Sequence, residues 1–270
     1  MAAVKIVCLI GPPAYLNYFV NEISSHFEVA LIIREHTPAN KLLEKIQKKG
    51  LVNSFRIAFQ KLKTRTRYQK EYNEILKDKW LNLPVNVPLF QTPSINESQV
   101  SQKLRNIKPD VVLVHGTSLI KMETLKDIPL VLNLHWGLSP YYKGSFCTEW
   151  ALINNDPFNI GFTIHRVSAK IDGGDILTQG TVTVEANDTS NRINMKLTKS
   201  GTSEMIKAIH RIINKEVPQY KIQEQTSGLL YLTKHWNRHC QKLINYLETS
   251  GSISEMIKKP SRKALSIVKW

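Results

Sequence analysis

The chain has 270 residues, of which 42% are hydrophobic and 22% charged, and it carries a formal net charge of +15 with a pI near 9.7. This apolar content is ordinary for a soluble globular protein, and the length allows one α/β domain of about 200 residues plus an appendage. The three cysteines, Cys8, Cys147 and Cys240, are far apart and lack metal-ligand spacing. They argue against a disulfide framework and a metal site, and favour a reducing compartment.

The amino-terminal apolar run, residues 1–11, is too short for a signal-peptide core with its cleavage site and predicts a buried strand. No segment approaches the roughly 20 apolar residues that span a bilayer. We therefore expect a cytoplasmic protein that does not enter the membrane.

The first half of the chain alternates predicted strands and helices. Apolar residues at helical spacing predict a helix over 14–27, followed by a strand over 28–33. Residues 84–90 are extended and bounded by proline, 96–107 predict a helix, and 111–114 and 130–132 predict two short buried strands. This alternation predicts a doubly wound α/β fold with a mostly parallel sheet.

Residues 40–80 form a helical and basic segment, with twelve Lys or Arg against four Asp or Glu between positions 41 and 79. A basic helix can bind nucleic acid through phosphates, but this one lacks interleaved aromatic residues, so nucleic acid is not the partner we expect. A positive rim that attracts an anionic, pyrophosphate-linked substrate is the preferred interpretation, and a solvated face is the alternative.

The second half predicts strands over 161–167 and 181–185, and a helix from a cap at 187–190 to about residue 213. We expect a catalytic domain over 1–213 that includes the basic segment. Residues 214–270 would form a small α+β appendage, with a strand over 228–232 and helices over 235–247 and 253–257.

Asn133 and His135 follow the strand that begins at residue 130, at the edge where parallel sheets bind ligands. Positions two apart in an extended segment point to the same side, so both side chains would enter one cleft. A carboxamide N–H and a protonated imidazole can stabilise an oxyanion, and a carboxylate beside the imidazole can orient and charge it and take a proton. Asp172, before Gly173 and Gly174, is the candidate. Such chemistry, the attack of an amine on a carbonyl, requires no metal.

Taken alone, each of these signals has a plainer explanation. An Asn-x-His triplet after a strand also fits a histidine that is simply hydrogen-bonded at the strand end, and an Asp-Gly pair is an ordinary turn signal. The same alternative applies to His115, a possible further titrating group.

Four motifs that follow one another in a fixed order favour the functional interpretation over these plainer ones. The segment from Asn133 to Gly144, then Thr148 to Asn155, Gly161 to His165, and Ile171 to Gln179, resembles the catalytic domain of 10-formyltetrahydrofolate-dependent formyltransferases. The resemblance covers about the middle third of the chain. It implies Asn133, His135 and Asp172 as the catalytic residues and 10-formyltetrahydrofolate as the co-substrate.

The resemblance also implies ligand contacts. The loop after the 111–114 strand would hold the folate together with Asp172, and its residues are Gly116, Thr117, Ser118 and Leu119. The loop after the catalytic strand would hold the substrate through Tyr142, Lys143, Glu149 and Trp150, with Lys143 as an anion contact. For Trp150, core packing at the start of a helix is the alternative.

Two departures from the family pattern favour its sugar-modifying branch. The motif His135-Trp-Gly-Leu-Ser-Pro140 resembles the one in that branch. Residues 10–15 lack the glycine loop of the phosphoribosylglycinamide enzymes. The resemblance therefore implies N-formylation of a nucleotide-linked amino sugar, with a dTDP-4-amino-4,6-dideoxy sugar for a surface polysaccharide, such as lipopolysaccharide O-antigen, as the best guess. A homodimer is expected from the family alone.

Three alternatives stay open. Methionyl-tRNA formylation is disfavoured because residues 214–270 are too few for the oligonucleotide-binding-type domain of those enzymes. Glycinamide ribonucleotide formylation is disfavoured by the amino-terminal loop. A non-catalytic RNA-binding protein would use the basic segment instead.

Overall fold

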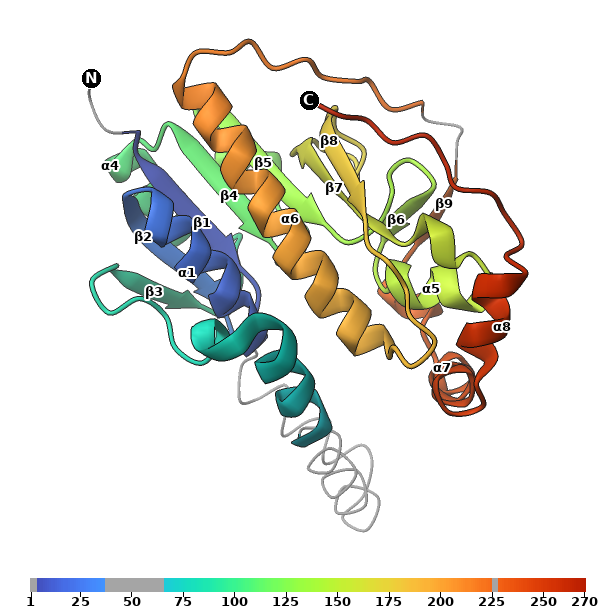
Figure 1. Ribbon diagram of the computed structural model, residues 1–270. Helices are drawn as coiled ribbons and strands as arrows, with labels where there is room; N and C mark the ends of the chain where they lie inside the picture. Colours follow the sequence, from blue (N-terminus) through green and yellow to red (C-terminus); the bar gives the residue numbers. More distant parts are fainter. Residues whose placement is uncertain (1–3, 37–65, 225–227) are drawn as a thin grey trace.

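The computed structural model describes residues 4–36, 66–224 and 228–270, and a seven-stranded sheet lies at the centre of this part of the chain (Figure 1). The strand order is β3-β2-β1-β4-β5-β7-β8. The strands are β1 (Ile6–Ile10), β2 (Val29–Glu35), β3 (Leu89–Thr92), β4 (Val111–His115), β5 (Leu130–His135), β7 (Gly161–Arg166) and β8 (Ile176–Thr181). β1 to β5 pair in parallel, and β7 and β8 join antiparallel. The predicted doubly wound, mostly parallel sheet is confirmed.

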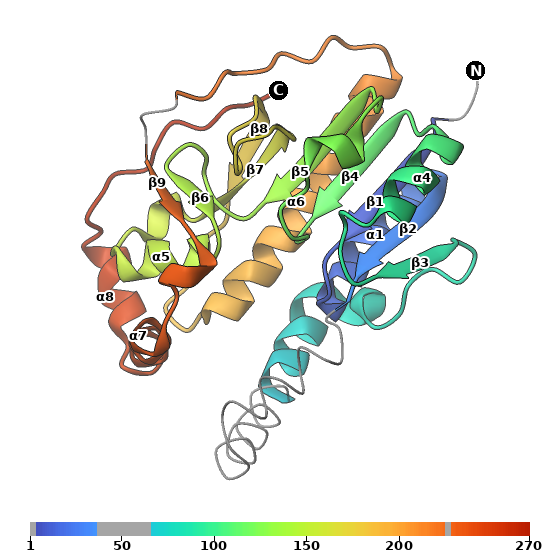
Figure 2. The same cartoon turned by 180° about the vertical axis from the view of Figure 1, so that it is seen from behind.

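Helices cover both faces of this sheet. α1 (Asn17–His26) and α6 (Ser190–Ile213) lie on one face and α4 (Ser98–Ile107) on the other (Figures 1 and 2). β1 serves both cores because neighbouring strand residues point to opposite sides. Its Ile6, Cys8 and Ile10 belong to the cluster beneath α1, whereas Val7 and Leu9 belong to the cluster beneath α4.

Side-chain caps set the start of two helices. Thr189 Oγ1 accepts a hydrogen bond from the Arg192 N–H at 3.0 Å, so α6 begins within the predicted cap. Asn237 Oδ1 accepts from the N–H groups of His239 and Cys240, and α7 (Arg238–Thr249) therefore begins three residues later than predicted.

The predicted strand over 181–185 is wrong, because β8 ends at Thr181. That residue pairs with Gly161, the first residue of β7, so the chain beyond it has no partner strand. One of the two valines in this segment, Val184, nevertheless packs into the main hydrophobic core.

The carboxyl-terminal residues pack against the rest of the fold. β6 (Tyr142–Gly144) pairs in parallel with β9 (Leu229–Tyr231), and beside this pair lie α5 (Cys147–Ile153), α7 and α8 (Ser252–Lys258). Ile244, Leu247 and Ile253 join the same hydrophobic cluster as the α6 face of the sheet. The domain division at residue 213 stays a prediction.

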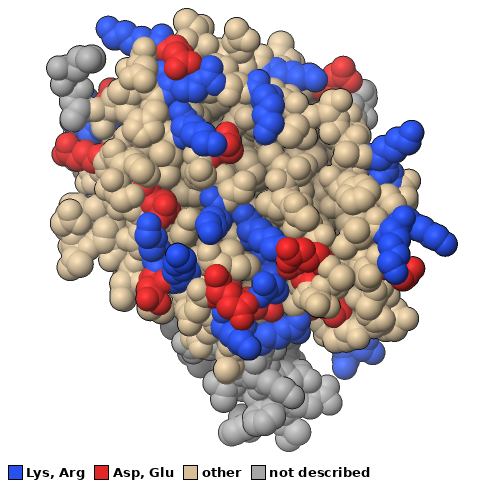
Figure 3. All heavy atoms as spheres, in the orientation of Figure 1, with Lys and Arg blue, Asp and Glu red and all other residues tan. Residues whose placement is uncertain are grey.

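Short 3-10 helices connect several elements: η1 (Ala14–Leu16), η2 (Lys77–Trp80), η3 (Met122–Leu125), η4 (Pro157–Asn159) and η5 (Thr233–His235). Only the end of the basic segment belongs to the described residues: 66–76 are helical and lead into η2, whereas 40–65 lie outside them. On the face seen in Figure 3, Lys and Arg side chains are spread over the surface and interspersed with Asp and Glu. Within the described ranges, no helix is long and apolar enough to cross a membrane.

Candidate active site

A cavity of about 730 Å³ opens at the carboxyl edge of the sheet. Its walls include residues that follow β1, β4, β5 and β7, the beginning of α5, the second turn of α6 and the β9–η5 segment. β1 and β4 are neighbours in the sheet, and the edge where the strand order reverses is where open α/β sheets bind ligands. The volume lies within the range of small-molecule pockets, and apolar and polar side chains line it together.

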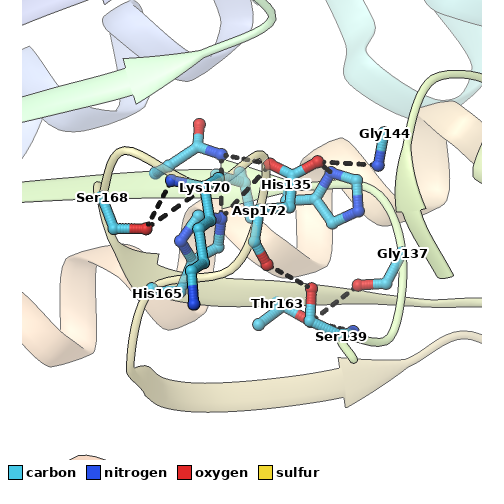
Figure 4. Close-up of polar contacts among 12 residues, drawn as sticks. His135, Gly137, Ser139, Gly144, Thr163, His165, Ser168, Lys170 and Asp172 are labelled. Carbon is cyan, nitrogen blue, oxygen red and sulfur yellow. Dashed lines mark hydrogen bonds and ion pairs between the residues drawn. The ribbon is translucent and has the colours of Figure 1, made fainter. Parts of the chain in front are cut away.

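The three predicted residues Asn133, His135 and Asp172 all line this cavity, and Figure 4 shows His135 beside Asp172. Asp172, from the loop between β7 and β8, places Oδ2 3.4 Å from His135 Nδ1 and Oδ1 3.4 Å from Asn133 Nδ2. Asn133 and His135 both project from β5 into the cavity, as their spacing predicts. We call these three residues the central trio.

His165 is a fourth member of this group, and the sequence analysis did not nominate it. Its Nε2 lies 3.5 Å from Asp172 Oδ1 and 3.1 Å from Asn133 Nδ2. Its position has a simple cause, since β5 and β7 pair antiparallel with Asn133 opposite His165. The signal was present in the sequence as a histidine at the end of a predicted strand, but its pairing partner was not predictable.

The hydrogen bonds of His165 orient the Asn133 carboxamide. His165 Nδ1 lies 2.8 Å from the Arg166 carbonyl oxygen, which only accepts, so Nδ1 carries the proton. In the neutral ring, Nε2 then accepts from Asn133 Nδ2. Both amide hydrogens of Asn133 thus point towards His165 and Asp172 in the free site.

Asp172 stays ionised. Burial raises the pKa of its carboxyl group, but the nearby His135 and His165 and the Gly144 N–H, 2.8 Å from Oδ2, outweigh burial and hold that pKa well below its usual range. The carboxylate is therefore a fixed negative charge beside two imidazoles.

The sequence predicts that Asp172 keeps the His135 ring charged, whereas the surroundings of the ring in the free site oppose protonation. The side chain is only 7% exposed, and this burial lowers the pKa of His135, against the opposing effects of Asp172 and of the hydrogen bond to Tyr142. The ring is therefore mainly neutral at neutral pH. Its Nε2 lies 3.0 Å from the Tyr142 carbonyl oxygen, so both ring nitrogens face acceptors and the ring is well placed to take up a proton.

The wall beside His135 is tight. A Cβ at Gly137 would lie 2.4 Å from His135 Nε2, so this position requires glycine. Cys147 Sγ lies 3.8 Å from the same nitrogen, and burial raises the pKa of this thiol well above its ordinary value. Cys147 is thus a neutral wall of the site.

The Asp172 loop is held by backbone contacts. Asp172 has a φ of +45°, a sparsely populated conformation that Asp tolerates better than most residues. Gln223 Nε2 donates to the carbonyl oxygens of Asp172 at 2.9 Å and Gly174 at 2.5 Å. A Cβ at Gly174 would lie 1.8 Å from the Arg166 carbonyl oxygen, so this glycine permits close packing of the backbone on itself rather than on a ligand.

The four residues nominated for the folate, Gly116, Thr117, Ser118 and Leu119, all line the cavity. The polar groups of Ser118 bind within the protein: its N–H and Oγ donate hydrogen bonds to Glu35 at 2.7 Å and 2.6 Å. Leu119 is 60% exposed and offers apolar surface beside the cavity. Their role in folate binding stays a prediction.

Of the four residues nominated for the substrate, only Glu149 lines the cavity among the described residues. The assignments of Tyr142 and Trp150 are corrected. The Tyr142 hydroxyl donates to Asp156 at 2.8 Å, and the Trp150 ring stacks on Tyr231 at 5.0 Å, so both side chains belong to the core. Lys143, the middle residue of β6, lies outside the cavity lining, and its role as an anion contact stays a prediction.

His115 forms part of the cavity wall but is hydrogen-bonded at its strand end. Its Nδ1 lies 2.8 Å from the Leu134 carbonyl oxygen, and burial lowers its pKa to about 4. It is therefore a neutral residue at neutral pH. Within the described ranges, no group of three His, Cys, Asp or Glu residues is placed to hold a metal ion.

Fold and site together define a Rossmann-like α/β protein with a polar ligand cavity at the carboxyl edge of its sheet. The formyl transferase family model matches residues 27–209, more than half of the chain, and the chain belongs to this family.

Curated and solved relatives agree with this membership. The methionyl-tRNA formyltransferase of Fusobacterium nucleatum is 28% identical over 175 residues, which cover 64% of this chain and 55% of that protein. The chain thus spans about half the length of this relative.

Two solved structures share the fold. A 4-N formyltransferase from Francisella tularensis is 21% identical with a TM-score of 0.57, and the match covers 91% of this chain and 87% of that one. An N-formyltransferase from Helicobacter canadensis is 19% identical with a TM-score of 0.55, covering 86% and 72%.

Proposed function

We propose that this protein is an N-formyltransferase that moves a formyl group from 10-formyltetrahydrofolate to the amino group of a nucleotide-linked amino sugar. The observation that carries the proposal is the convergence of the central trio on one cavity of a formyl transferase fold. A carboxamide, a neutral imidazole and a carboxylate can together manage the charge and the proton of an amine attacking a carbonyl.

The reaction has a simple atom balance. The folate would supply the formyl carbon, which forms a bond to the amine nitrogen while its bond to the folate nitrogen breaks. The amine must lose one proton, and the folate nitrogen must gain one. No further reactant is required, and proximity of the two substrates in one cavity provides part of the acceleration.

His135 is the proposed proton carrier. Its neutral ring takes the amine proton, and the resulting imidazolium donates from Nδ1 to Asp172 and faces the negative charge that develops on the formyl oxygen. The ionised Asp172 orients the ring and stabilises its positive charge, so the proton is held until the folate nitrogen takes it.

Asn133 is the proposed second donor to the developing oxyanion. Its amide hydrogens point towards His165 and Asp172 in the free site, so donation requires the amide to release one of these contacts. His165 therefore sets how readily Asn133 turns towards the formyl oxygen.

Solved relatives support an amino sugar as the acceptor. The Helicobacter canadensis structure is described as a complex with folinic acid and dTDP-3-aminofucose. The Francisella tularensis structure, described as a 4-N formyltransferase, matches over 91% of this chain. A dTDP-4-amino-4,6-dideoxy sugar destined for a surface polysaccharide such as lipopolysaccharide O-antigen is the specific acceptor that we propose, with a homodimer as the assembly.

The second candidate is formylation of methionyl-tRNA, which the Fusobacterium nucleatum relative favours. The salt dependence of kcat/KM distinguishes the two candidate functions. A tRNA substrate binds largely through its phosphates, so its kcat/KM falls steeply as the salt concentration rises. A small nucleotide sugar shows a much weaker dependence.

The test is a screen of the purified protein. It is incubated with 10-formyltetrahydrofolate and, in separate reactions, with nucleotide-linked 3-amino and 4-amino sugars, glycinamide ribonucleotide and methionyl-tRNA. Mass spectrometry then identifies the acceptor that gains one formyl group. We expect a gain on a nucleotide amino sugar; a gain on methionyl-tRNA or glycinamide ribonucleotide alone would overturn the proposal.

A further inference from the structure

A second polar group lies in the cavity, and the proposed chemistry does not use it. Glu149, in the first turn of α5, lines the cavity, and its Oε1 accepts from Asn194 Nδ2 at 3.2 Å. Burial of the carboxyl group raises the pKa of Glu149.

Besides His115, whose Nε2 is also unpaired, three lining residues hold buried polar atoms without a hydrogen-bond partner among the described residues. These atoms are Trp136 Nε1, Thr148 Oγ1 and Asn194 Oδ1. Thr148 is 3% exposed and Asn194 9% exposed, so neither is freely solvated. Buried polar groups in proteins are normally paired, and unpaired ones in a cavity wall indicate that a ligand or water completes them.

An aromatic wall accompanies these polar groups. The rings of Tyr15 and Trp136 stack with centroids 5.5 Å apart, and both residues line the cavity. Aromatic surface beside carboxylate and amide acceptors suits a ring that has apolar faces and hydroxyl groups at its edge, as a sugar has.

Among the described residues, no Lys or Arg lines the cavity beside Glu149. Although the chain has a net charge of +15, Lys170 is the one Lys or Arg among the described residues that line the cavity, and the acidic residues in that lining are Asp172 and Glu149. Lys170 is on the Asp172 loop, not beside Glu149. A buried carboxylate accepts hydroxyl hydrogens but repels phosphate oxygens.

We propose that Glu149, supported by Asn194, Thr148, Tyr15 and Trp136, is a hydroxyl-recognising subsite that binds the pyranose ring of the acceptor and leaves its diphosphate outside. This inference rests on the proposed function and specifies how the acceptor lies: the sugar enters first, and at least one of its hydroxyl groups donates to Glu149. Glu149 is then a residue that determines specificity, not a catalytic residue.

The test measures binding of two probes by calorimetry without folate. The probes are dTDP-4-amino-4,6-dideoxyglucose and free dTDP, which lacks the sugar ring. For Glu149→Ala and, to a smaller extent, Glu149→Gln, which keeps one acceptor oxygen, we expect Kd for the nucleotide sugar to rise about tenfold to a hundredfold, because the sugar hydroxyl loses its carboxylate acceptor. We expect Kd for dTDP to change less than twofold.

Glu71→Gln is the matched control. Glu71 likewise accepts side-chain hydrogen bonds, from Thr189 and Asn191, but it does not line the cavity, so both affinities should stay at the wild-type values. Thermal melting establishes that each variant is folded.

If the Glu149 variants bind the nucleotide sugar and dTDP more weakly by the same factor, or if neither affinity changes, the proposed subsite is wrong. If the wild type transfers no formyl group but still binds the sugar through Glu149, the proposed function is contradicted and the subsite is supported. The two failures are therefore distinguishable.

Discussion

Asp172 connects four functional groups. Its two oxygens face His135, His165, Asn133 and the Gly144 N–H, all within 3.5 Å. The carboxylate therefore sets both the orientation of the imidazole and the direction of the carboxamide, which explains why one acidic residue remote in the sequence can organise the whole site.

The pH dependence of turnover tests the protonation state of His135. Burial lowers the pKa of His135 below its usual 6.5, and the proposed proton carrier is the neutral ring. With saturating substrates, kcat should therefore be constant above about pH 6.5 and fall as the pH decreases through the lowered pKa. A kcat that instead declines from pH 6.5 to pH 8 would show that the protonated ring is the working form.

A histidine-to-glutamine change at position 165 tests its role as a positioning residue. His165→Gln removes the ring that accepts from Asn133 and contacts Asp172. We expect kcat to fall about tenfold to a hundredfold while KM for both substrates changes less than threefold, because the effect acts through Asn133. The pH profile should shift as well, since His165 is one of the groups that hold down the pKa of Asp172. A fall in thermal stability with unchanged kcat would indicate a purely structural role.

Stability also depends on pH through His115. Its folded pKa of about 4 lies below the usual histidine pKa of 6.5, so the unfolded chain binds more protons between these two values. The stabilisation is complete above about pH 6.5 and is lost as the pH falls towards 4, by at most about 3 kcal/mol. Urea unfolding at pH 7 and pH 4.5 should show a smaller loss for His115→Gln than for the wild type. Equal losses would contradict the assignment.

The central trio could be predicted because its residue types, spacing and order are specific to a family. His165 could not, because its role depends on which strands pair. Tyr142 and Trp150 were misassigned for a related reason: aromatic residues suit both ligand contact and core packing, and only the positions of Asp156 and Tyr231 decide between them.

At the level of elements, Glu35 ties three segments together. It ends β2, is 6% exposed, and accepts hydrogen bonds from the N–H of Ile95 at 2.7 Å and from the N–H and Oγ of Ser118. These contacts fix the loop after β4, which lines the cavity and which we expect to hold the folate.

Removing this carboxylate should loosen the loop. Glu35→Ala is expected to lose about 2 kcal/mol or more of unfolding free energy, because buried N–H groups lose their acceptor. KM for 10-formyltetrahydrofolate should rise at least about fivefold in steady-state kinetics. Asp188→Asn is the control: this carboxylate is also buried and paired, with Lys196 at 2.7 Å, but lies outside the cavity lining. If both variants raise this KM equally, the effect is one of general stability.

Element types were largely predictable, whereas some boundaries were not. The helix that ends at Ile213 and the strand at β9 agree with their patterns, since hydrophobic periodicity and capping residues are local signals. The prediction of a strand over 181–185 was wrong because a strand needs a pairing partner, and β7 begins at Gly161 and offers none beyond it.

At the level of the whole molecule, the carboxyl-terminal segment shares the core and also forms part of the cavity wall. Tyr231, Leu232 and Thr233 line the cavity, and Ile244 and Ile253 pack in the main cluster. Short sequence patterns predicted the elements of this segment but not where it packs.

Core variants in this segment test whether it unfolds with the sheet. Ile244 is 2% exposed, and Ile244→Ala should cost about 2 to 5 kcal/mol through the cavity it leaves. We expect a single unfolding transition, seen by circular dichroism, that moves as a whole to lower denaturant. Two transitions, of which only the smaller moves, would instead support a separate appendage from residue 214.

The central claim is that this site transfers a formyl carbon under the control of Asp172. The most direct measurement follows a ¹³C-labelled formyl group from 10-formyltetrahydrofolate to dTDP-4-amino-4,6-dideoxyglucose, for the wild type and for Asp172→Asn. We predict transfer by the wild type and a rate at least about a thousandfold lower for the variant, with the affinity for the nucleotide sugar changed less than threefold. Transfer by Asp172→Asn at the wild-type rate, or no transfer by the wild type to any amino sugar, would contradict the account.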